Sequence, residues 1–524
     1  MSCLGKMLTA IFSLKSDLKC ILYSGPSGPP HLIFGGIIMN YIEAIKKEEL
    51  IKTTTEKGDV AFKTSGSYCL DFYSLMGGMR TNYLGLNNLF LRSYYEDRLI
   101  TLKIMLHLRD ILGGLGERNS FRMTFNLFAN LNPNLARQLI PLIPQYGRYD
   151  DLFAGMNTKI ESDVLKYIET QLDKDLENLT LGKEISLLPK WLPSINTSSK
   201  SARLLARKVA KHLGLTHKEY RQMLSKLRKG NILENHLREK DYSFDYRHVP
   251  SQAFLKYVKA FYRHDGKRLE RYLDKVDAGD AKMNTKTAQT VQVAFKHCCV
   301  SHLPRFYDTY WKALPKFEIK TKAIIVRDGS GSMLWGLGTY QPIEVATSLA
   351  LYFAEQLPEP FKNHFITFSE NPQLINIPEG TLEEKLDYIR TFNDVANTNI
   401  SKVYELLLNV AKKNEVKQKD MVEQVIIISD MQFDRCVEGQ STFETYKEKF
   451  QEIGLKMPEL IFWNVAARDI QTPVTANELG VKLVSGGSQK IIELVVNNEL
   501  EPITPYEFML KVLEKYNEVD KFLK

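Results

Sequence analysis

The chain changes its hydrophobic pattern near Lys320, and this change divides it into two kinds of fold. Before that point, apolar residues recur with helical spacing over long segments. After it, short apolar runs alternate with helical segments. Helix after helix predicts an all-α part, whereas strand and helix in alternation predict a doubly wound parallel sheet. The sequence therefore predicts a multidomain protein with an all-α domain followed by an α/β domain.

Helices are expected throughout residues 39–316. The clearest is Asp97–Leu112, which Gly113-Gly114 ends, followed by Ser120–Asn130 with its phenylalanines on one face. Further helices are expected at 134–143, 161–174, 199–213, 216–228, 250–264 and 267–275. Alternating β patterns are absent here. Stacked helices of these lengths are typical of a HEAT-like helical-repeat domain, although no strict period occurs.

An α/β domain is expected over residues 317–500. Its strands are predicted at Ala323–Val326, His364–Phe368, Val425–Ile428 and Leu460–Val465. Its helices are predicted at 342–356, 381–390, 399–413, 441–453 and 486–497. A last amphipathic helix, Pro505–Leu523, is expected to fill the C-terminal segment 501–524.

Residues 1–38 differ from the rest of the chain. Ser24–Pro30 is rich in Gly and Pro, which excludes a helix there. The Gly35-Gly36 pair shortly precedes Met39, and two glycine codons can be written GGAGGN, a bacterial ribosome-binding sequence. We therefore expect 1–38 to be a non-native or disordered extension, with translation from Met39 in a bacterial or phage gene.

Charge is distributed unevenly along the chain. From Thr321 onward there are 21 Lys and Arg against 30 Asp and Glu, which leaves 49 against 32 before that residue. A basic part of this size favours a polyanion such as RNA as partner. A solvated, lysine-rich surface is the alternative.

No membrane segment is expected, because no apolar run reaches the roughly 18 residues that span a bilayer. None of the six cysteines lies in a C-x-x-C spacing, so neither a structural zinc site nor a disulfide framework is expected. The sequence therefore predicts a cytoplasmic protein.

Positive charge is most concentrated in Lys200–Lys229, where Glu219 is the only acidic residue. The candidate RNA-binding residues are Lys200, Arg203, Arg207, Lys208, Lys211, Arg221, Lys226 and Arg228. Positions 200, 203, 207 and 211 have helical spacing and form one stripe, which would neutralise phosphates without reading sequence. An ordinary solvated face would have the same pattern.

Two neighbouring features carry weaker signals. Tyr146, Arg148 and Tyr149 would stack on unpaired bases, but buried tyrosines between helices are the alternative. Gly113–Gly116 has neither the lysine nor the preceding strand of a phosphate loop, so no nucleotide is expected to bind that loop.

The sharpest motif is Asp328-Gly329-Ser330-Gly331-Ser332, directly after the first strand of the α/β part. A second carboxylate, Asp430, ends a later strand. Because the carboxyl ends of parallel strands meet at one sheet edge, we expect these groups to lie together. Their hard oxygen donors suit Mg²⁺ or Mn²⁺. A turn that uses Asp, Gly and Ser for local hydrogen bonds would explain the first motif alone.

This motif resembles the metal-ion-dependent adhesion site of von Willebrand factor A domains, which are Rossmann-like. The resemblance implies that Ser330 and Ser332 bind the metal directly, while Asp328 and Asp430 act largely through water. It also implies a threonine ligand, which we assign to Thr398, although the loop before it lacks the family's usual glycines.

The whole layout resembles the Ro ribonucleoprotein (TROVE) family, and more closely a related family found in large viruses, bacteria and eukaryotes. The segments that carry this resemblance are Arg109–Arg118, Tyr146–Leu152, Val249–Ser251 and Ser429–Asp434. In Ro proteins the helical repeats form a ring that binds structured RNA outside and single-stranded RNA ends in its hole. The resemblance implies the same two RNA classes here.

We therefore expect a non-catalytic RNA-binding protein whose metal has an open position for a partner's carboxylate. Asp434, four residues after Asp430, would close that position if it turned inwards. The alternative is a protein-interaction scaffold that uses this metal without binding RNA. A two-metal hydrolase needs several clustered carboxylates, and no Ser-His-Asp or Cys-His arrangement is evident, so no enzymatic activity is expected.

Overall fold

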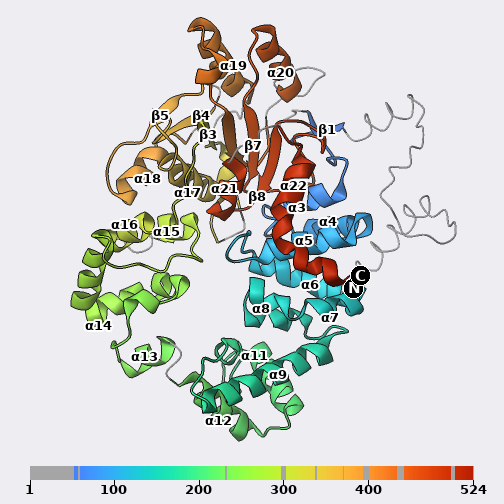
Figure 1. Cartoon of the computed structure of the whole chain (residues 1–524), viewed down its shortest axis with the longest axis vertical. Coiled ribbons are helices and arrows are strands. Elements are labelled where there is room, and N and C mark those ends of the chain that lie inside the picture. Colours follow the sequence, from blue (N-terminus) through green and yellow to red (C-terminus); the bar gives the residue numbers. More distant parts are fainter. Residues whose placement is uncertain are drawn as a thin grey trace, which may run out of the picture. The chain divides into compact units, whose positions relative to one another are not determined.

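A computed structural model describes residues 52–56, 60–229, 233–296, 303–336, 339–369, 371–393, 400–433, 442–496 and 502–522. Residues 51–524 form one compact unit. The expected extension at 1–38 and the start at Met39 lie outside the described residues. As predicted, a mostly helical first part is followed by an α/β part (Figure 1).

The α/β part is built on a six-stranded sheet in the order β5-β4-β3-β6-β7-β8. Its strands are β3 (Ala323–Asp328), β4 (His364–Phe368), β5 (Leu374–Asn376), β6 (Gln424–Ser429), β7 (Glu459–Asn464) and β8 (Val481–Ser485). All neighbours are parallel except β4 and β5. The four predicted strands are therefore confirmed, and two edge strands were missed.

The missed strand β8 has a charged residue at its second position, which interrupts its apolar pattern. Lys482 is nevertheless buried, and its Nζ lies 3.5 Å from Glu459 Oε2 and donates to the carbonyl of Val495 at 2.8 Å. A buried charge is tolerated where it is paired in this way. The tertiary contacts of Lys482 thus explain why the strand was not evident from the sequence.

Helices cover the sheet and extend beyond it. They are α17 (Pro342–Ala354), α18 (Leu382–Arg390), α19 (Ile400–Lys413), α20 (Thr442–Glu452), α21 (Ile492–Val496) and α22 (Pro505–Leu513). Helix α17 is buried on almost all sides because it packs both on β3 and on helices of the first part. Because α17 is covered on both sides, nearly all of its residues are apolar or small, with no polar face.

The last predicted helix, Pro505–Leu523, is only partly correct. The chain is α-helical to Leu513 and continues as the 3₁₀ helix η7 (Glu514–Phe522). Tyr516 departs from helical geometry (φ −106°, ψ 20°) and is fully buried against His107. The contact of this aromatic ring with the first part of the chain therefore overrides the regular helix.

The first part runs through an arc of helices (Figure 1). They are α3 (Tyr68–Leu75), α4 (Tyr83–Glu96), α5 (Arg98–Arg109), α6 (Arg118–Leu131), α7 (Pro133–Leu139), α8 (Leu142–Tyr146), α9 (Glu161–Thr180), α10 (Leu188–Trp191), α11 (Lys200–His212), α12 (His217–Arg228), α13 (Leu233–Glu239), α14 (Ser251–Asp277), α15 (Thr290–Lys296) and α16 (Pro304–Lys312), with the 3₁₀ helices η1 (Tyr149–Gly155) and η2 (Tyr246–His248). Two of the predicted helices, 250–264 and 267–275, are the halves of α14, which departs from helical geometry at Asp265.

The expected absence of β structure before residue 316 is wrong. Strands β1 (Lys52–Thr54) and β2 (Val60–Phe62) form an antiparallel pair, and Phe62 also bridges to Thr472 of the α/β part. Each strand has only three residues, which is too short to show an alternating pattern.

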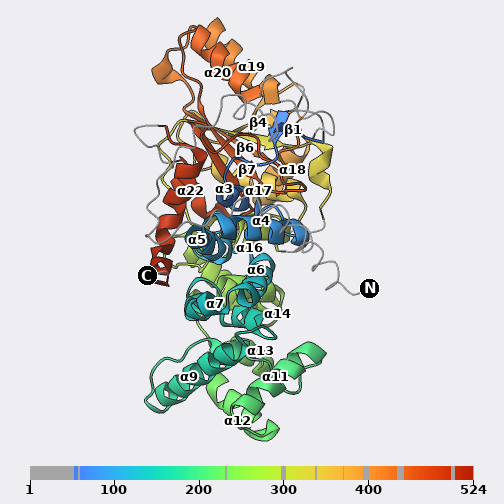
Figure 2. The same cartoon turned by 90° about the vertical axis from the view of Figure 1, so that its right-hand side faces the viewer.

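Both ends of the helical arc pack on the α/β part. Helix α3 lies on β8, where the hydroxyl of Ser485 donates to the carbonyl of Tyr73 at 3.1 Å. At the other end α15 lies on α17, where the hydroxyls of Thr290 and Ser348 are 3.1 Å apart. Two views place α11 and α12 far from α19 and α20 (Figure 2). No helix among the described residues combines the length and apolarity needed to cross a membrane.

Candidate metal site and basic surfaces

The two predicted aspartates meet at the point where the strand order reverses. The chain builds the sheet outward from β3 on one side and from β6 on the other, and these two central strands are parallel neighbours. Asp328 ends β3 and Asp430 directly follows β6. In doubly wound sheets, ligands bind outside the carboxyl ends of the strands at this switch point. The fold therefore brings both carboxylates to the usual ligand position.

Short hydrogen bonds hold the Asp328 motif in place. The hydroxyl of Ser429 donates to Asp328 Oδ2 at 2.6 Å, and the backbone N–H of Ser330 donates to Asp328 Oδ1 at 2.9 Å. The Oγ atoms of Ser330 and Ser332 are 3.0 Å apart. Asp328 and Ser330 are fully buried. The motif thus gathers one carboxylate and two hydroxyls in a fixed loop.

Asp430 has an oxygen without a hydrogen-bond partner. Its Oδ1 accepts from the backbone N–H of Gln432 at 3.2 Å, while Oδ2 is buried with no hydrogen bond, and the nearest cation, Arg468 Nη2, is 3.7 Å away. Burial, followed by repulsion from Asp328, raises the pKa of Asp430 to about 6. A buried carboxylate pair of this kind is stabilised by a cation.

The donor set consists of carboxylate and hydroxyl oxygens. Among the described residues no group of three or more His, Cys, Asp and Glu side chains could hold a metal ion. Asp328, Ser330, Ser332 and Asp430 instead offer two carboxylates and two hydroxyls, which fit Mg²⁺ or Mn²⁺ rather than zinc. Thr398, the expected threonine ligand, and Asp434 lie outside the described residues.

Two arginines beside this site were missed in the sequence. Arg327 is fully buried on β3 and donates to Asn393 Oδ1 at 2.8 Å and to the carbonyl of Phe392 at 3.1 Å. Burial lowers its pKa to about 10. A charge within an apolar strand is a signal that could have identified it. Arg468 donates to the carbonyl of Ser332, but its position in a distant loop gives no such signal.

The predicted RNA-binding residues lie on α11 and α12, and the structure separates them into two groups. Five are exposed and make no ion pair with the described residues: Lys200, Arg207, Lys211, Arg221 and Lys226. The side chains of the exposed group are available to solvent along two consecutive helices.

The other three predicted cations make internal contacts. Arg203 donates to the carbonyls of Thr197 and Ser198, just before its own helix. Lys208 pairs with Glu161 at 2.9 Å. Arg228 donates to the carbonyls of Pro189 and Leu192. The structure therefore engages these three side chains in contacts within the helical part.

The tyrosine motif after α7 is packed against the C-terminal segment. Tyr146 is buried, lies against the ring of Tyr516 and donates to Glu518 at 3.2 Å. Arg148 stacks over Trp191, with its guanidinium carbon 3.9 Å from the ring centroid. The contacts of Tyr146 agree with the interpretation of a buried tyrosine between helices, whereas Tyr149 is half-buried.

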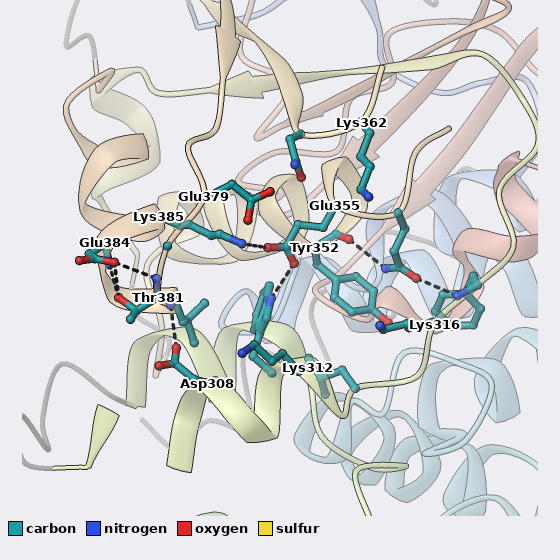
Figure 3. Close-up of a pocket in the computed structure, with 17 residues that line it drawn as sticks. Asp308, Lys312, Lys316, Tyr352, Glu355, Lys362, Glu379, Thr381, Glu384 and Lys385 are labelled. Atoms are coloured by element: carbon teal, nitrogen blue, oxygen red, sulfur yellow. Dashed lines mark hydrogen bonds and ion pairs between the residues drawn. The ribbon is translucent and has the colours of Figure 1, made fainter. Parts of the chain in front are cut away.

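A cavity of about 660 Å³ lies between α16, the end of α17 and the start of α18 (Figure 3). Glu355 accepts from Trp311 Nε1 at 2.8 Å and from Lys385 Nζ at 2.7 Å, and Asp308 accepts from the backbone N–H of Leu382 at 2.7 Å. Charges of both signs line this cavity, and Lys385 pairs with Glu355 across it. Its chemistry therefore does not select one class of ligand.

Known proteins match both parts of the chain. Residues 322–518 match a family described as a domain of unknown function (DUF7788), and residues 151–297 match another domain of unknown function (DUF2828). The crystal structure of the Deinococcus radiodurans RO (RSR) protein aligns with a TM-score of 0.33 and 11% identity, covering 84% of this chain and 92% of that one.

A relative with similar length is the uncharacterized protein L728 of Acanthamoeba polyphaga mimivirus. It is 30% identical over 509 residues, which cover 88% of this chain and 87% of the relative. This match spans both the helical and the α/β parts, and it confirms the expected relationship to a family that occurs in large viruses. The chain belongs to the family of the mimivirus protein L728.

Proposed function

We propose that this chain is a non-catalytic RNA-binding protein whose α/β part is a von Willebrand factor A-type domain with a metal-ion-dependent adhesion site. The observation that carries the proposal is the buried Asp328–Asp430 pair at the switch point of the sheet. Its neighbouring hydroxyls, and the buried Asp430 Oδ2 that accepts no hydrogen bond, are suited to a divalent ion.

Four side chains would hold the ion. Ser330 and Ser332 would be direct ligands through their hydroxyls, while Asp328 and Asp430 would contribute negative charge directly or through water. When bound, the ion would attract a carboxylate from a partner, because few anions of this chain neutralise it. Ser429 and the N–H of Ser330 keep Asp328 oriented towards this position.

RNA binding rests on the charge of the helical part. The exposed cations Arg207 and Lys211 are one helical turn apart on α11, and Arg221 and Lys226 extend the positive surface along α12. Such a surface binds phosphates without sequence preference, and its affinity falls steeply with salt.

A metal titration of the full chain tests the adhesion site. In calorimetry, Mn²⁺ should bind the wild type, and the double variant Ser330→Ala with Ser332→Ala should lose that binding because two hard donors are gone. Ser225→Ala, at an exposed position of α12, is the matched control. Unchanged Mn²⁺ affinity in the double variant, with both variants folded, would refute the site.

A partner carboxylate has its own test. Short peptides with a central Glu or Asp should bind the Mn²⁺-loaded chain and not the metal-free chain. If they bind equally well in the presence of a chelator, the metal does not serve as an adhesion site.

A further inference from the structure

A second cavity, with a strongly basic lining, lies at the start of α6. This cavity has a volume of about 610 Å³, which is within the range of small-molecule sites. Its charged lining residues are Arg80, Arg109, Glu117, Arg118, Arg148 and Lys490. Five of these six are basic, in contrast to the mixed charges of the cavity in Figure 3.

Internal carboxylates neutralise three of the five cations. Arg80 pairs with Glu117 at 2.7 Å, Arg109 pairs with the buried Asp151 at 2.7 Å, and Arg148 pairs with Asp150 at 2.6 Å. Asp150 and Asp151 also pair with Arg122, each at 2.7 Å. The acidic groups around the cavity are thus already engaged.

Arg118 and Lys490 have no carboxylate within ion-pair distance among the described residues. Lys490 Nζ is hydrogen-bonded to the carbonyl of Ile111, and Arg118 is exposed without a side-chain hydrogen bond to any described residue. Although Arg118 is exposed, partial burial and then the nearby cations Arg148 and Arg122 lower its pKa, against the opposite effect of Asp150 and Asp151. An anion in the cavity would relieve this repulsion.

The backbone adds donors at the same place. Helix α6 has 14 residues, and its N-cap residue, Glu117, makes no side-chain capping hydrogen bond. Arg118, Asn119 and Ser120 at its first turn all line the cavity. The N–H groups of a first turn lack intrahelical acceptors, and with the helix dipole they favour an anion.

The preceding glycine loop positions this helix start without offering its own amides. The N–H groups of Gly114 and Gly116 donate to the carbonyl of Asp110, and that of Glu117 donates to the carbonyl of Leu108. A Cβ atom at Gly114 would lie 2.2 Å from the carbonyl of His107, so only glycine fits there. The loop therefore differs from a phosphate loop, as its sequence indicates.

We propose that this cavity binds a phosphate monoester, with the phosphate group at the N-terminus of α6 beside Arg118. The neutral amides of Gln252 and Gln292, on the facing elements α14 and α15, line the same cavity and would contact the polar remainder of the ligand. The phosphate belongs either to a free nucleotide or to the end of an RNA strand. The site does not depend on the adhesion site or on the α11–α12 surface.

Calorimetry on the full chain with inorganic phosphate and with adenosine 5′-monophosphate tests the site. Both should bind the wild type. Arg118→Gln should weaken this binding about ten-fold, because a charge-assisted contact is lost, whereas Arg118→Lys should retain most of it. Arg263→Gln is the matched control, since Arg263 is exposed on α14 away from the cavity lining.

A pair of short oligoribonucleotides, identical except for a 5′-phosphate or a 5′-hydroxyl, separates the two sources of phosphate. Preference for the 5′-phosphorylated strand assigns the site to RNA ends, and equal affinity assigns it to free nucleotides. The proposal is overturned if the wild type binds neither inorganic phosphate nor the nucleotide, or if Arg118→Gln binds them as tightly as the wild type. Inorganic phosphate binding is measured without RNA, so failure of RNA binding elsewhere would not affect this result.

Discussion

The hydroxyl of Tyr516 donates a hydrogen bond of 3.0 Å to Asp110 Oδ2, although 406 positions separate the two residues. His107 Nδ1 lies 3.2 Å from the same hydroxyl, and Lys515 Nζ lies 2.6 Å from Asp110 Oδ2. This buried network ties η7 to the end of α5. The C-terminal segment η7 therefore packs into the core of the helical part.

Tyr516→Phe should lower the free energy of unfolding by about 1–3 kcal/mol, because the buried Asp110 carboxylate loses a donor. Urea unfolding measures this change. Tyr95→Phe, on an exposed ring, is the control and should have little effect. Equal stability of the Tyr516→Phe variant and the wild type would show that Lys515 alone satisfies Asp110 Oδ2.

The contribution of His107 to stability should decrease as the pH falls from about 6.5 towards 4. Burial lowers the pKa of His107 to about 4, so the unfolded chain binds a proton in this range and the folded chain does not. The contribution of His107 to this loss should reach about 2 kcal/mol at pH 5. Unfolding of the wild type and of His107→Gln between pH 7 and 5 measures it. Parallel pH profiles would contradict this prediction.

Asp151→Asn should destabilise the chain by about 3–5 kcal/mol, because the buried Arg109 would lose its counter-charge. Asp151 also accepts from Arg122 and from the backbone N–H of Arg148, so one carboxylate joins α5, α6 and η1. Thermal unfolding, compared with the exposed control Asp173→Asn, checks this. A small effect at Asp151 would mean that Arg109 finds water or another acceptor.

Gly77→Ala should destabilise the contact between the two parts of the chain. A Cβ atom at Gly77 would lie 2.7 Å from the backbone nitrogen of Gly486, so the backbones would have to separate, at a cost of about 1–3 kcal/mol. Gly266→Ala, within α14 and with no atom close to the new Cβ, should instead be neutral or stabilising by up to about 1 kcal/mol. Equal stabilities of the two variants would disagree with the packing of Gly77.

The double reversal Arg207→Glu with Lys211→Glu should weaken RNA binding uniformly across sequences. Each lost phosphate contact should reduce the slope of log affinity against log salt by about 1. Lys412→Glu with Lys413→Glu makes the same charge change at an exposed pair on α19 and should have much less effect. If both double variants lose affinity equally, net charge and not the α11–α12 surface determines binding.

The type and order of most helices and strands could be predicted from the sequence, and so could the meeting of the two aspartates at one sheet edge. The run Ala323–Val326 and the motif that follows it determine a strand with a polar loop at its carboxyl end, because apolar periodicity and glycine preference act within a few residues. The spacing of cations on α11 was readable for the same reason. Strands of three residues, such as β1 and β2, carry too little pattern to be recognised.

Only the tertiary structure decided which charges remain available. Arg207 and Arg203 are four positions apart on one helix, yet the first is exposed and the second is held by carbonyls that precede the helix. The basic cavity likewise combines Arg118 with Lys490, which no local pattern relates. Sequence periodicity determines on which face of a helix or strand a residue lies. Whether a charge on that face is paired, buried or free depends on long-range packing, because electrostatic energies depend on the neighbours and the dielectric that the fold supplies.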